Sequence, residues 1–515
     1  VKWWYKNGEN DNTYFAIPYH ENKDINLFFI DFIVFFILVL TAVVIIKNRK
    51  FQLLILLAAS YYFFYFSSNY LIVLLIFSTI LGFFVAKMIH NTKDIAKKKI
   101  LLTISIVGNL GLLGFFKYAD FAILQFNIMG NSINLNPEIP FLNLILPLGI
   151  SFYTFQTLSY TIDVYRGSLT PSKTLSEFAL FVAFFPQLIS GPILRAKQFL
   201  PQLREKIQNF ETGGGIKQII LQSSNLKFGI TLMDFGFFKK MFFADNIAPL
   251  VDDIFFNPIG AESFTIILGA LAFAVQVYGD FSGYTDIAIG AALILGFKIP
   301  ANFNYPYFAT SPAAFWNKWH ISLSSWVRDY LYLPLIFKNR KSTLRVFTGL
   351  MISFFLIGFW HGAGLNFIIF GIIQGLFVGV HTVIRKKIPF LRNHFFFKTK
   401  LGTVISILIT QYLTFFSFLA FRIHDMDHLF YSMQKYLLID FQIVETIGVI
   451  QSHKISIILM ISFMVIHFIS FKKGNLVEKF ANLNYFYWVL FLVTGILLIL
   501  LFYDGNPTDF IYFKF

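Results

Sequence analysis

The sequence predicts an all-α, polytopic membrane protein with about 11 to 13 transmembrane helices and some re-entrant segments. Of its 515 residues, 57% are hydrophobic and 13% are charged, and the mean hydropathy is +0.66. A soluble globule cannot cover its surface with so few charges. The apolar residues also gather in runs close to the ~20 residues that one helix needs to cross a bilayer.

The candidate spans are apolar runs separated by short polar segments. They are 27–46, 51–66, 70–89, 100–116, 142–160, 178–189, 219–243, 264–295, 347–360, 365–384, 403–421, 455–471 and 485–502. Some are too short or too rich in Pro and Gly to cross alone, which is why re-entrant pieces are expected. The first run is as long as a span and is followed by no small-residue cleavage pattern, so we expect it to remain in the membrane.

The net charge of +15 is spread over short blocks between the apolar runs. Such blocks are typical of topological anchors on the cytoplasmic side, whereas a nucleic-acid binder gathers its cations on one soluble face, so no nucleic-acid partner is expected. The blocks are 47–50, 93–99, 195–206, 338–345 and 385–400. The cation-poor segment 127–138 then faces outward, and the alternation holds through the first five runs with the N-terminus outside.

Cysteine is absent from the sequence. Disulfides, thiolate metal sites and a cysteinyl acyl-enzyme are therefore excluded. Any nucleophile is a hydroxyl or belongs to the substrate.

His361 ends an apolar run that starts near Leu350, in the stretch Phe-Trp-His-Gly-Ala-Gly at 359–364. A polar ring at membrane depth costs several kcal/mol unless it is partnered, so it points to a pathway or a reaction site. Gly362 and Gly364 leave room for backbone or substrate beside the ring. The alternative is a core histidine bonded to a neighbouring carbonyl.

His320 lies in segment 311–335, where Ser311 suggests an N-cap and Pro312 the first helical position. Aromatic and apolar residues recur there at helical spacing, and polar residues fall on the opposite face. The apolar face holds Trp316, Trp319, Leu323, Trp326 and Tyr330, and the polar face holds Asn317, His320, Ser324 and Arg328. An amphipathic interfacial helix with an incidental histidine is the alternative.

Two further segments interrupt their apolar surroundings. Asp280 and Asp286 lie inside the run 264–295, where a carboxylate indicates either a functional site or the cap of a broken helix. Segment 185–195 contains Pro186, Gly191 and Pro192, which favours a re-entrant stretch whose basic end meets an anionic donor or anchors the topology.

His424 and His428 are spaced like a metal pair, with Asp425 and Asp427 beside them. The glutamate of a zinc hydrolase helix is missing, so we interpret this segment as a solvated loop and expect no metal site.

At these residues the sequence resembles the membrane-bound O-acyltransferases, and within them the branch of alginate O-acetylation proteins. The resemblance covers roughly residues 50–425 and rests on motifs that follow the family's order, together with an aromatic C-terminus at 510–515. The motifs are 116–120 (Phe-Lys-Tyr-Ala-Asp), 146–152 (Leu-Pro-Leu-Gly-Ile-Ser-Phe), 160–167, 185–195, 280–290, 315–334 and 360–364.

The resemblance implies that His361 matches the essential catalytic histidine and His320 the second histidine of the active site. It also implies a tunnel, with acetyl-CoA or another acyl thioester arriving from the cytoplasm, no tightly bound cofactor, and an acceptor outside. A neutral imidazole can take the proton of an attacking hydroxyl. Residues that hold the substrate or stabilise an oxyanion are then expected near these histidines. The candidates are Asn317, Ser324, Arg328, Asp280 and Asp286.

The expected function is transfer of an acetyl group to hydroxyls of an extracytoplasmic, alginate-like polysaccharide in the inner (cytoplasmic) membrane, with an extracytoplasmic acetyltransferase partner protein. Alternatives are D-alanyl transfer to teichoic acid, peptidoglycan O-acetylation, a transporter or flippase, and an inactive scaffold. The sequence departs from the branch at 336–338, where Ile-Phe-Lys replaces the usual Gly-Gly. The expected divisions are a polar leader 1–26, N-terminal transmembrane helices 27–160, a catalytic core 161–425 and C-terminal transmembrane helices 426–515.

Overall fold

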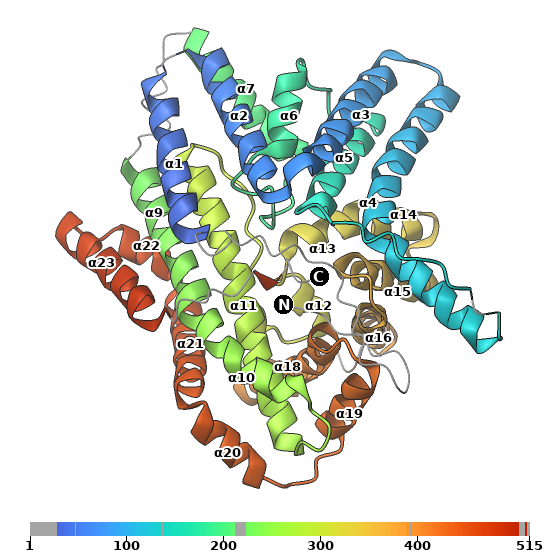
Figure 1. Ribbon diagram of the computed structural model, residues 1–515, viewed down its shortest axis with the longest axis vertical. Helices are drawn as coiled ribbons and strands as arrows, with labels where there is room; N and C mark the ends of the chain where they lie inside the picture. The colour runs from blue at the N-terminus through green and yellow to red at the C-terminus, as the bar shows by residue number, and fades with distance from the viewer. Residues whose placement is uncertain are drawn as a thin grey trace. The chain divides into compact units, whose positions relative to one another are not determined.

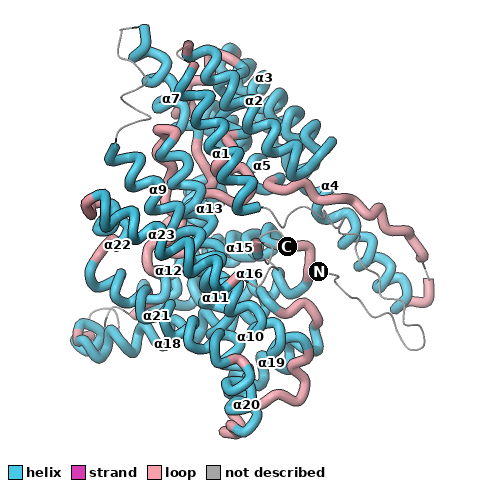
Figure 2. The backbone as a smooth tube through the Cα atoms, turned by 60° about the vertical axis from the view of Figure 1, so that its left-hand side comes forward, coloured by secondary structure: helices cyan, strands magenta, loops and turns pink. Residues whose placement is uncertain are grey.

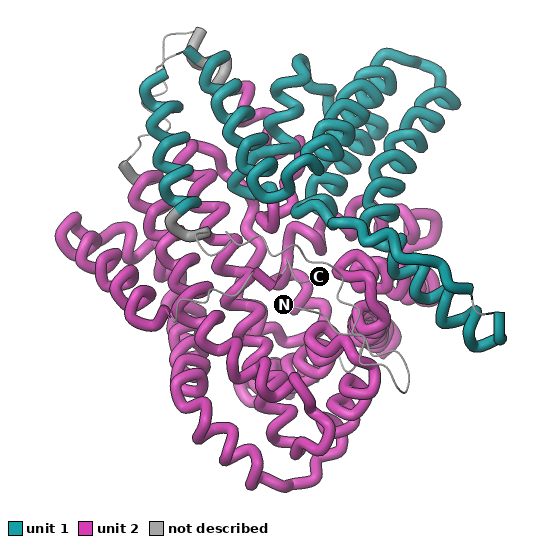
Figure 3. Tube along the Cα trace, in the orientation of Figure 1, with its two compact units in different colours: residues 1–188 teal, residues 189–515 magenta. Residues whose placement is uncertain are grey.

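The structure is a computed structural model that describes residues 28–46, 48–135, 137–211, 223–388, 390, 394–503 and 510–511. The expected leader 1–26 and residues 512–515 of the aromatic C-terminus lie outside the described residues. The chain forms two compact units, residues 1–188 and 189–515 (Figure 3). The divisions expected at residues 160 and 425 stay predictions.

The first unit is a set of helices, with a longer connection at residues 133–149 (Figure 1). They are α1 (Phe28–Ile45), α2 (Arg49–Ser68), η2 (Asn69–Leu71), α3 (Ile72–Asn91), α4 (Ile95–Ser132), α5 (Ile150–Tyr165) and α6 (Leu175–Ala183). Small and polar side chains join α3, α4 and α5. The Ser78 hydroxyl, for example, donates to Asn109 Oδ1 at 2.5 Å and contacts Thr157 Oγ1 at 3.2 Å, with all three residues buried. Such hydrogen bonds satisfy polar groups where lipid cannot.

The second unit is also helical, and no strand occurs in the described part of the chain (Figure 2). Its elements before residue 320 are α7 (Ala196–Glu211), α9 (Ser223–Phe237), the π-helix η3 (Phe238–Ala244), α10 (Asp245–Phe256), α11 (Ser263–Ile294), η4 (Pro306–Phe308) and α12 (Pro312–Trp316). Next come α13 (Ile321–Val327), the π-helix η5 (Arg328–Tyr332), α14 (Leu333–Ile336), η6 (Phe337–Asn339), α15 (Thr343–His361) and α16 (Leu365–Lys387). The last are η7 (Phe395–Lys398), α18 (Lys400–Arg422), α19 (Met426–Leu437), α20 (Val444–Ser452), α21 (Lys454–Lys473), α22 (Leu476–Ala481) and α23 (Tyr485–Phe502).

Within the described residues, eight helical stretches are long and apolar enough to cross a membrane. They are Lys50–Asn91, Ile95–Ser132, Ser263–Ile294, Thr343–His361, Leu365–Lys387, Lys400–Arg422, Lys454–Lys473 and Tyr485–Phe502. The expected all-α, polytopic membrane fold is therefore confirmed. Several other apolar runs form shorter helices: run 142–160 becomes a non-helical stretch followed by the 16-residue α5, and run 178–189 contributes only the end of α6.

α11 is the central helix of the second unit. Of its most apolar window, 78% is buried, the largest share among the eight stretches, and it packs against α9, η3, α10 and α18. It runs without a break for 32 residues and carries Asp280 and Asp286 in its interior. The expectation that these two residues could cap a broken helix is therefore wrong, because every backbone group around them stays in the helical ladder.

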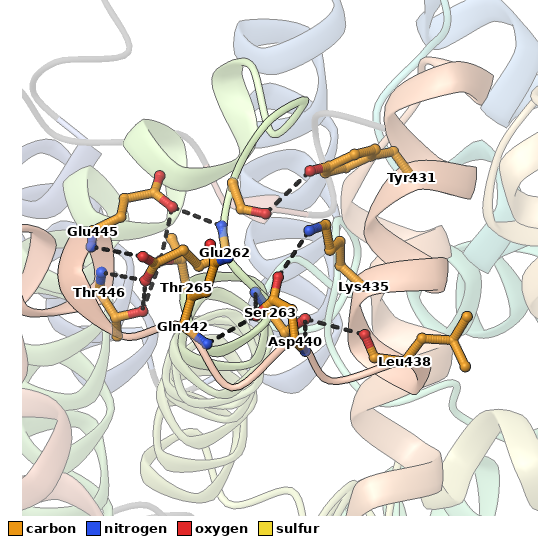
Figure 4. A network of polar contacts seen from close by, with 11 residues as sticks. Glu262, Ser263, Thr265, Tyr431, Lys435, Leu438, Asp440, Gln442, Glu445 and Thr446 are labelled. Carbon is orange, nitrogen blue, oxygen red and sulfur yellow. Dashed lines mark hydrogen bonds and ion pairs between the residues drawn. The ribbon is translucent and has the colours of Figure 1, made fainter.

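The N-terminus of α11 is joined to that of α20 by an exchange of carboxylates (Figure 4). The Glu262 carboxylate accepts hydrogen bonds from the backbone N–H groups of Glu445, at 3.1 Å, and Thr446, at 3.2 Å. The Glu445 carboxylate accepts from the backbone N–H of Glu262 at 2.7 Å and from the Thr265 hydroxyl at 3.3 Å. Each helix thus supplies the N-terminal cap of the other, where an anion also meets the positive end of the helix dipole.

Asp440 completes this network from the α19–α20 connection. Its carboxylate accepts from the backbone N–H of Ser263 at 3.4 Å and of Gln442 at 3.2 Å. The Lys435 ammonium donates to the same carboxylate at 2.8 Å, and this hydrogen-bonded cation lowers the pKa of Asp440 to about 2 (Figure 4). The ionised form is therefore the one that the fold stabilises.

We expect Asp440→Asn to lower the melting temperature at pH 7 by roughly 2–4 °C, because the amide loses the charge that faces Lys435. The contribution of Asp440 to stability is complete above its ordinary pKa of 3.8 and is lost as the pH falls through about 2. The difference between wild type and variant should therefore shrink across that window, as measured by thermal unfolding in detergent. Glu138→Gln, at an exposed carboxylate outside this network, is the control. A difference that does not change with pH would contradict the prediction.

Candidate active site

The two histidines singled out in the sequence come together around Trp360. The Trp360 ring lies 5.1 Å from the His361 ring and 6.2 Å from the His320 ring, measured between centroids. His320 is fully buried and His361 is 6% exposed. Phe281 of α11 meets the His320 ring edge-on at 4.8 Å, and Phe421 of α18 meets the His361 ring at 5.0 Å. The two imidazoles therefore share one aromatic enclosure, although 40 residues separate them in the chain.

His361 owes its position to a tight hairpin of α15 and α16, which lie side by side (Figure 1). It is the last residue of α15, and residues 362–364 reverse the chain before α16 begins at Leu365. The backbones touch at Gly358, where an added Cβ would lie 2.3 Å from the carbonyl oxygen of Phe367. A glycine here lets the two helices approach as closely as membrane helices do.

The glycines after His361 accommodate the protein's own side chains. A Cβ at Gly362 would lie 2.0 Å from the Phe367 ring, and one at Gly364 would lie 2.3 Å from Asn366 Oδ1. The expectation that these glycines leave space for a substrate beside the ring is therefore wrong in its detail. They allow Phe367 and Asn366 to fold back over the turn, and this packing fixes the end of α15.

The segment around His320 begins as the sequence predicts and then breaks. Ser311 Oγ accepts from the Ala314 N–H at 3.2 Å and Pro312 is the first helical residue, so both cap predictions are confirmed. α12 ends at Trp316, however, and His320 has a left-handed backbone with φ 43°. α13 then starts anew, because Asn302 takes up its first N–H groups: the Asn302 carbonyl accepts from Ile321 at 2.9 Å.

The predicted polar stripe of this segment does not exist, because the break at His320 rotates the residues after it. His320 is buried, whereas Asn317 and Arg328 are exposed and Ser324 is half-buried. The Ser324 hydroxyl donates to the Trp319 carbonyl at 3.3 Å, and Arg328 pairs with the neighbouring Asp329 at 2.8 Å. The substrate-binding roles of Asn317, Ser324 and Arg328 stay predictions.

Asp280 and Asp286 form ion pairs with consecutive lysines of η3. Lys240 Nζ lies 2.6 Å from Asp280 and 2.8 Å from Asp245, and Lys239 Nζ lies 2.5 Å from Asp286. Asp280 also accepts from the backbone N–H of Ile511 at 2.9 Å. These carboxylates neutralise buried cations, which accounts for their presence in an apolar helix. Their proposed contact with substrate stays a prediction.

Sequence reasoning missed Lys239 and Lys240, although a signal was present. The apolar run 219–243 contains Lys227, Asp234, Lys239 and Lys240, and the run 264–295 contains Asp280 and Asp286, so the two runs together hold three lysines and three aspartates. Equal numbers of opposite charges at membrane depth favour pairing. The separation of the aspartates by six residues hides the pattern, because the π-helix of η3 sets which lysine faces which carboxylate.

Segment 184–195 is non-helical and almost entirely buried, as expected for an irregular stretch at membrane depth. In the second unit, the backbone N–H of Ile193 donates to Ser322 Oγ at 2.9 Å, which ties the segment to α13. Arg195 Nη1 lies 2.6 Å from Asp329, and its guanidinium stacks over the Tyr330 ring at 5.3 Å. The basic end of this segment is thus neutralised within the protein.

His424 was expected in a solvated loop, and the structure places it beside the site instead. Its Nδ1 lies 3.3 Å from Asn366 Nδ2, which also donates to the Ala420 carbonyl at 3.0 Å. Asp425 caps α19 by accepting from the His428 N–H at 2.9 Å. In the part of the chain that the structure describes, no three His, Asp or Glu side chains group to hold a metal ion.

The environment keeps His320 and His424 neutral. His320 lies between the spans Ser263–Ile294 and Thr343–His361, and burial lowers its pKa to about 3. Burial, assisted by the positive charge of Arg422, lowers the pKa of His424 to about 4. At neutral pH each of these rings therefore has one protonated nitrogen and one nitrogen with a lone pair.

We expect Gly362→Ala to destabilise the protein by about 1–3 kcal/mol, because its Cβ would overlap the Phe367 ring. Denaturation in detergent measures the loss. In a Phe367→Ala background the same alanine should cost much less, since the ring that it meets is gone. Gly111→Ala is a matched control, because a Cβ there meets no atom within 4 Å. Equal costs at both glycines would refute this account.

Lys240→Met should destabilise the protein strongly, by about 3–5 kcal/mol, because it leaves buried carboxylates without their cation. Lys239→Met should cost less, since its ion pair is about one-fifth exposed. Adding Asp280→Asn to Lys240→Met should recover part of the loss, because the uncompensated charge is removed. Unfolding that is unchanged by Lys240→Met would show that the ion pair does not stabilise the unit.

The part of the chain that contains this site is similar to a known family. Residues 172–422 match the MBOAT, or membrane-bound O-acyltransferase, family model. The chain is 41% identical over 288 residues to a probable alginate O-acetylase AlgI of Azotobacter vinelandii, covering 55% of this chain and 54% of that protein. It is 38% identical over 328 residues to a peptidoglycan O-acetyltransferase of Helicobacter pylori, covering 59% of each. It is 29% identical over 307 residues to a teichoic acid D-alanyltransferase of Bacillus subtilis, covering 57% of this chain and 72% of that protein.

The chain thus spans little more than half the length of its alginate and peptidoglycan relatives. The matched residues contain His320, Trp360 and His361, together with the α11 ion pairs that support them. Residues 172–422 are thus the part of the chain that is similar to the membrane-bound O-acyltransferase family.

Proposed function

We propose that the protein is a membrane O-acyltransferase that moves an acetyl group from a thioester, acetyl-CoA or another carrier, to a hydroxyl of an extracytoplasmic polysaccharide. The observation that carries the proposal is that the buried His320 and His361 rings both lie beside the Trp360 ring, inside the matched region. The two relatives described above at 41% and 38% identity are named for acetyl transfer, whereas the D-alanyl relative is 29% identical. Acetyl is therefore the group proposed here.

In this proposal His361 is the general base. The acceptor O–H gives its proton to the imidazole as its oxygen attacks the thioester carbonyl carbon. The tetrahedral intermediate then expels the thiolate, which recovers the proton from the imidazolium, so that an ester and a thiol result. His361 is the last residue of the 19-residue α15, and the negative end of that helix dipole stabilises the charge that the ring gains. His320 offers a neutral ring that also lies beside Trp360.

Charge distribution supports the direction of transfer. Basic residues gather before α15 and at the end of α16, and also at the end of α21, so these ends face the cytoplasm in the proposed topology. α15 then leads from that side to His361. The opposite end of the unit carries Asp440, Glu445 and Glu262, and in this proposal it faces the polysaccharide. An extracytoplasmic partner protein would act there.

A transporter is less well supported. Ion-coupled transport uses carboxylates that change their protonation or bind the ion. Asp280 and Asp286 are instead held in ion pairs with Lys240 and Lys239.

The relatives are named for three different acceptors, alginate, peptidoglycan and teichoic acid. The assay that tests the proposed function therefore includes all three polymers.

We expect His361→Ala to lower acetyl transfer by about 10²–10⁴-fold, the usual contribution of a general base. Native membrane vesicles that carry wild type or variant, and retain any partner, are supplied with labelled acetyl-CoA on the cytoplasmic side, and ester-linked label is measured on alginate, glycan-strand and teichoic acid acceptors. His453→Ala, at a histidine paired with Asp253 outside the site, is the matched control and should label like wild type. Equal labelling by His361→Ala would remove His361 from the mechanism. Label on none of the acceptors with wild type would refute the proposed function.

A further inference from the structure

Asn302 is a buried amide that joins α11, α13 and His320. It lies in the non-helical connection after α11 and is fully buried. Its Oδ1 accepts from the Ser322 backbone N–H at 3.2 Å and from the Ser322 hydroxyl at 2.6 Å, and it lies 3.4 Å from His320 Nδ1. Its Nδ2 lies 3.5 Å from Thr285 Oγ1 on α11.

The surroundings fix which end of the amide faces the histidine. A backbone N–H only donates, so the side-chain atom next to Ser322 N must be the oxygen. The Ser322 hydroxyl agrees with this orientation: it accepts from the Ile193 N–H at 2.9 Å, which leaves its own hydrogen to donate to Asn302 Oδ1. The orientation of Asn302 thus follows from two donors that do not depend on the histidine.

An acceptor that faces His320 Nδ1 determines the tautomer of the ring. A neutral imidazole carries its hydrogen on one nitrogen and its lone pair on the other. Because Asn302 Oδ1 accepts, Nδ1 carries the hydrogen and Nε2 has the lone pair. The left-handed backbone of His320, with φ 43°, and the edge contact with Phe281 hold the ring in this place.

We propose that Asn302 is a positioning residue that holds His320 as its Nδ1–H tautomer, so that Nε2 is the hydrogen-bond acceptor offered to the reacting groups. In the reaction, Nε2 accepts a hydrogen bond from the acceptor alcohol or from the protonated base, and no bond to carbon forms at His320. The catalytic consequence rests on the proposed acyl transfer. The tautomer itself does not, and it is tested separately.

A double-mutant cycle tests the catalytic consequence. Asn302→Leu removes the acceptor and should lower kcat by about 10–100-fold, as is usual for a residue that orients a functional histidine, with KM within about twofold of wild type. Asn302→Asp keeps an oxygen at the same place and should restore most of kcat. In a His320→Ala background, Asn302→Leu should cost nothing more, because the ring that it orients is absent.

The alternative is that Asn302 only supports the fold by capping α13. In that case Asn302→Leu would lower kcat in the His320→Ala background as well, and this result would overturn the proposal. Gln52→Leu is the control for loss of a buried amide, since Gln52 bonds to the carbonyls of Val43 and Ile46 in the first unit. Its kcat should stay within about twofold of wild type.

Nitrogen-15 spectra read the tautomer without turnover. The chain has 10 histidines, so the signals of His320 are obtained by subtracting the spectrum of ¹⁵N-histidine-labelled His320→Gln from that of wild type. We expect a protonated Nδ1 and an unprotonated Nε2 near neutral pH, and a change in this pattern in Asn302→Leu. A protonated Nε2 in wild type would overturn the proposal. Wild type that transfers no acetyl group would refute the proposed function, and the spectrum would still decide the tautomer.

Discussion

The ion pair between Lys240 and Asp280 is the interaction on which the second unit depends. It lies in the interior, with both side chains about 5% exposed, and it binds η3 to α11. α11 in turn provides Phe281 against the His320 ring and Thr285 beside Asn302. A buried ion pair adds little net stability over an apolar contact, but a shift of either helix would leave a buried charge uncompensated. The pair therefore fixes the register of α11, and α11 fixes the place of His320.

The need to pair every buried polar group also explains the irregular backbone near the site. Irregular structure survives at membrane depth only where each N–H and C=O finds a partner within the protein. α13 supplies some of these partners: in segment 184–195, the Ile193 N–H donates to Ser322, and at the break Asn302 accepts from Ile321 and Ser322. A short helix with external caps can place a histidine in the interior at an angle that a continuous helix would not allow.

The sequence predicted the features that depend on local residue patterns. Apolar runs gave the helical membrane fold, the cap at Ser311 and Pro312 followed from residue types alone, and His361 stood out because a titratable ring ends an apolar run. The break at His320 was missed because its cause, Asn302, lies 18 residues earlier in the chain. Helical periodicity describes a helix with continuous hydrogen bonds. It contains no information on a cap that a residue distant in the chain supplies.

Interactions between residues far apart in the chain explain the other differences between the expectations from sequence and the structure. The two aspartates of α11 were recognised as unusual, but their partners come from a π-helix 40 residues upstream, a geometry that residue spacing does not encode. His424 was assigned to a loop by its charged neighbours. In the fold, Asp425 is used as a helix cap and Arg422 pairs with Asp252, which leaves His424 turned toward Asn366.

The two central histidines differ because their surroundings differ. His361 lies at the carboxyl end of α15, where the helix dipole favours a cation, whereas His320 is enclosed by rings and amides that hold it neutral. Two imidazolium ions in one enclosure of low dielectric constant would repel each other. The arrangement therefore allows one proton to be held at His361 while His320 remains a hydrogen-bond acceptor. A base and an acceptor of one residue type are thus distinguished by their surroundings, which is what the proposed transfer of a single proton requires.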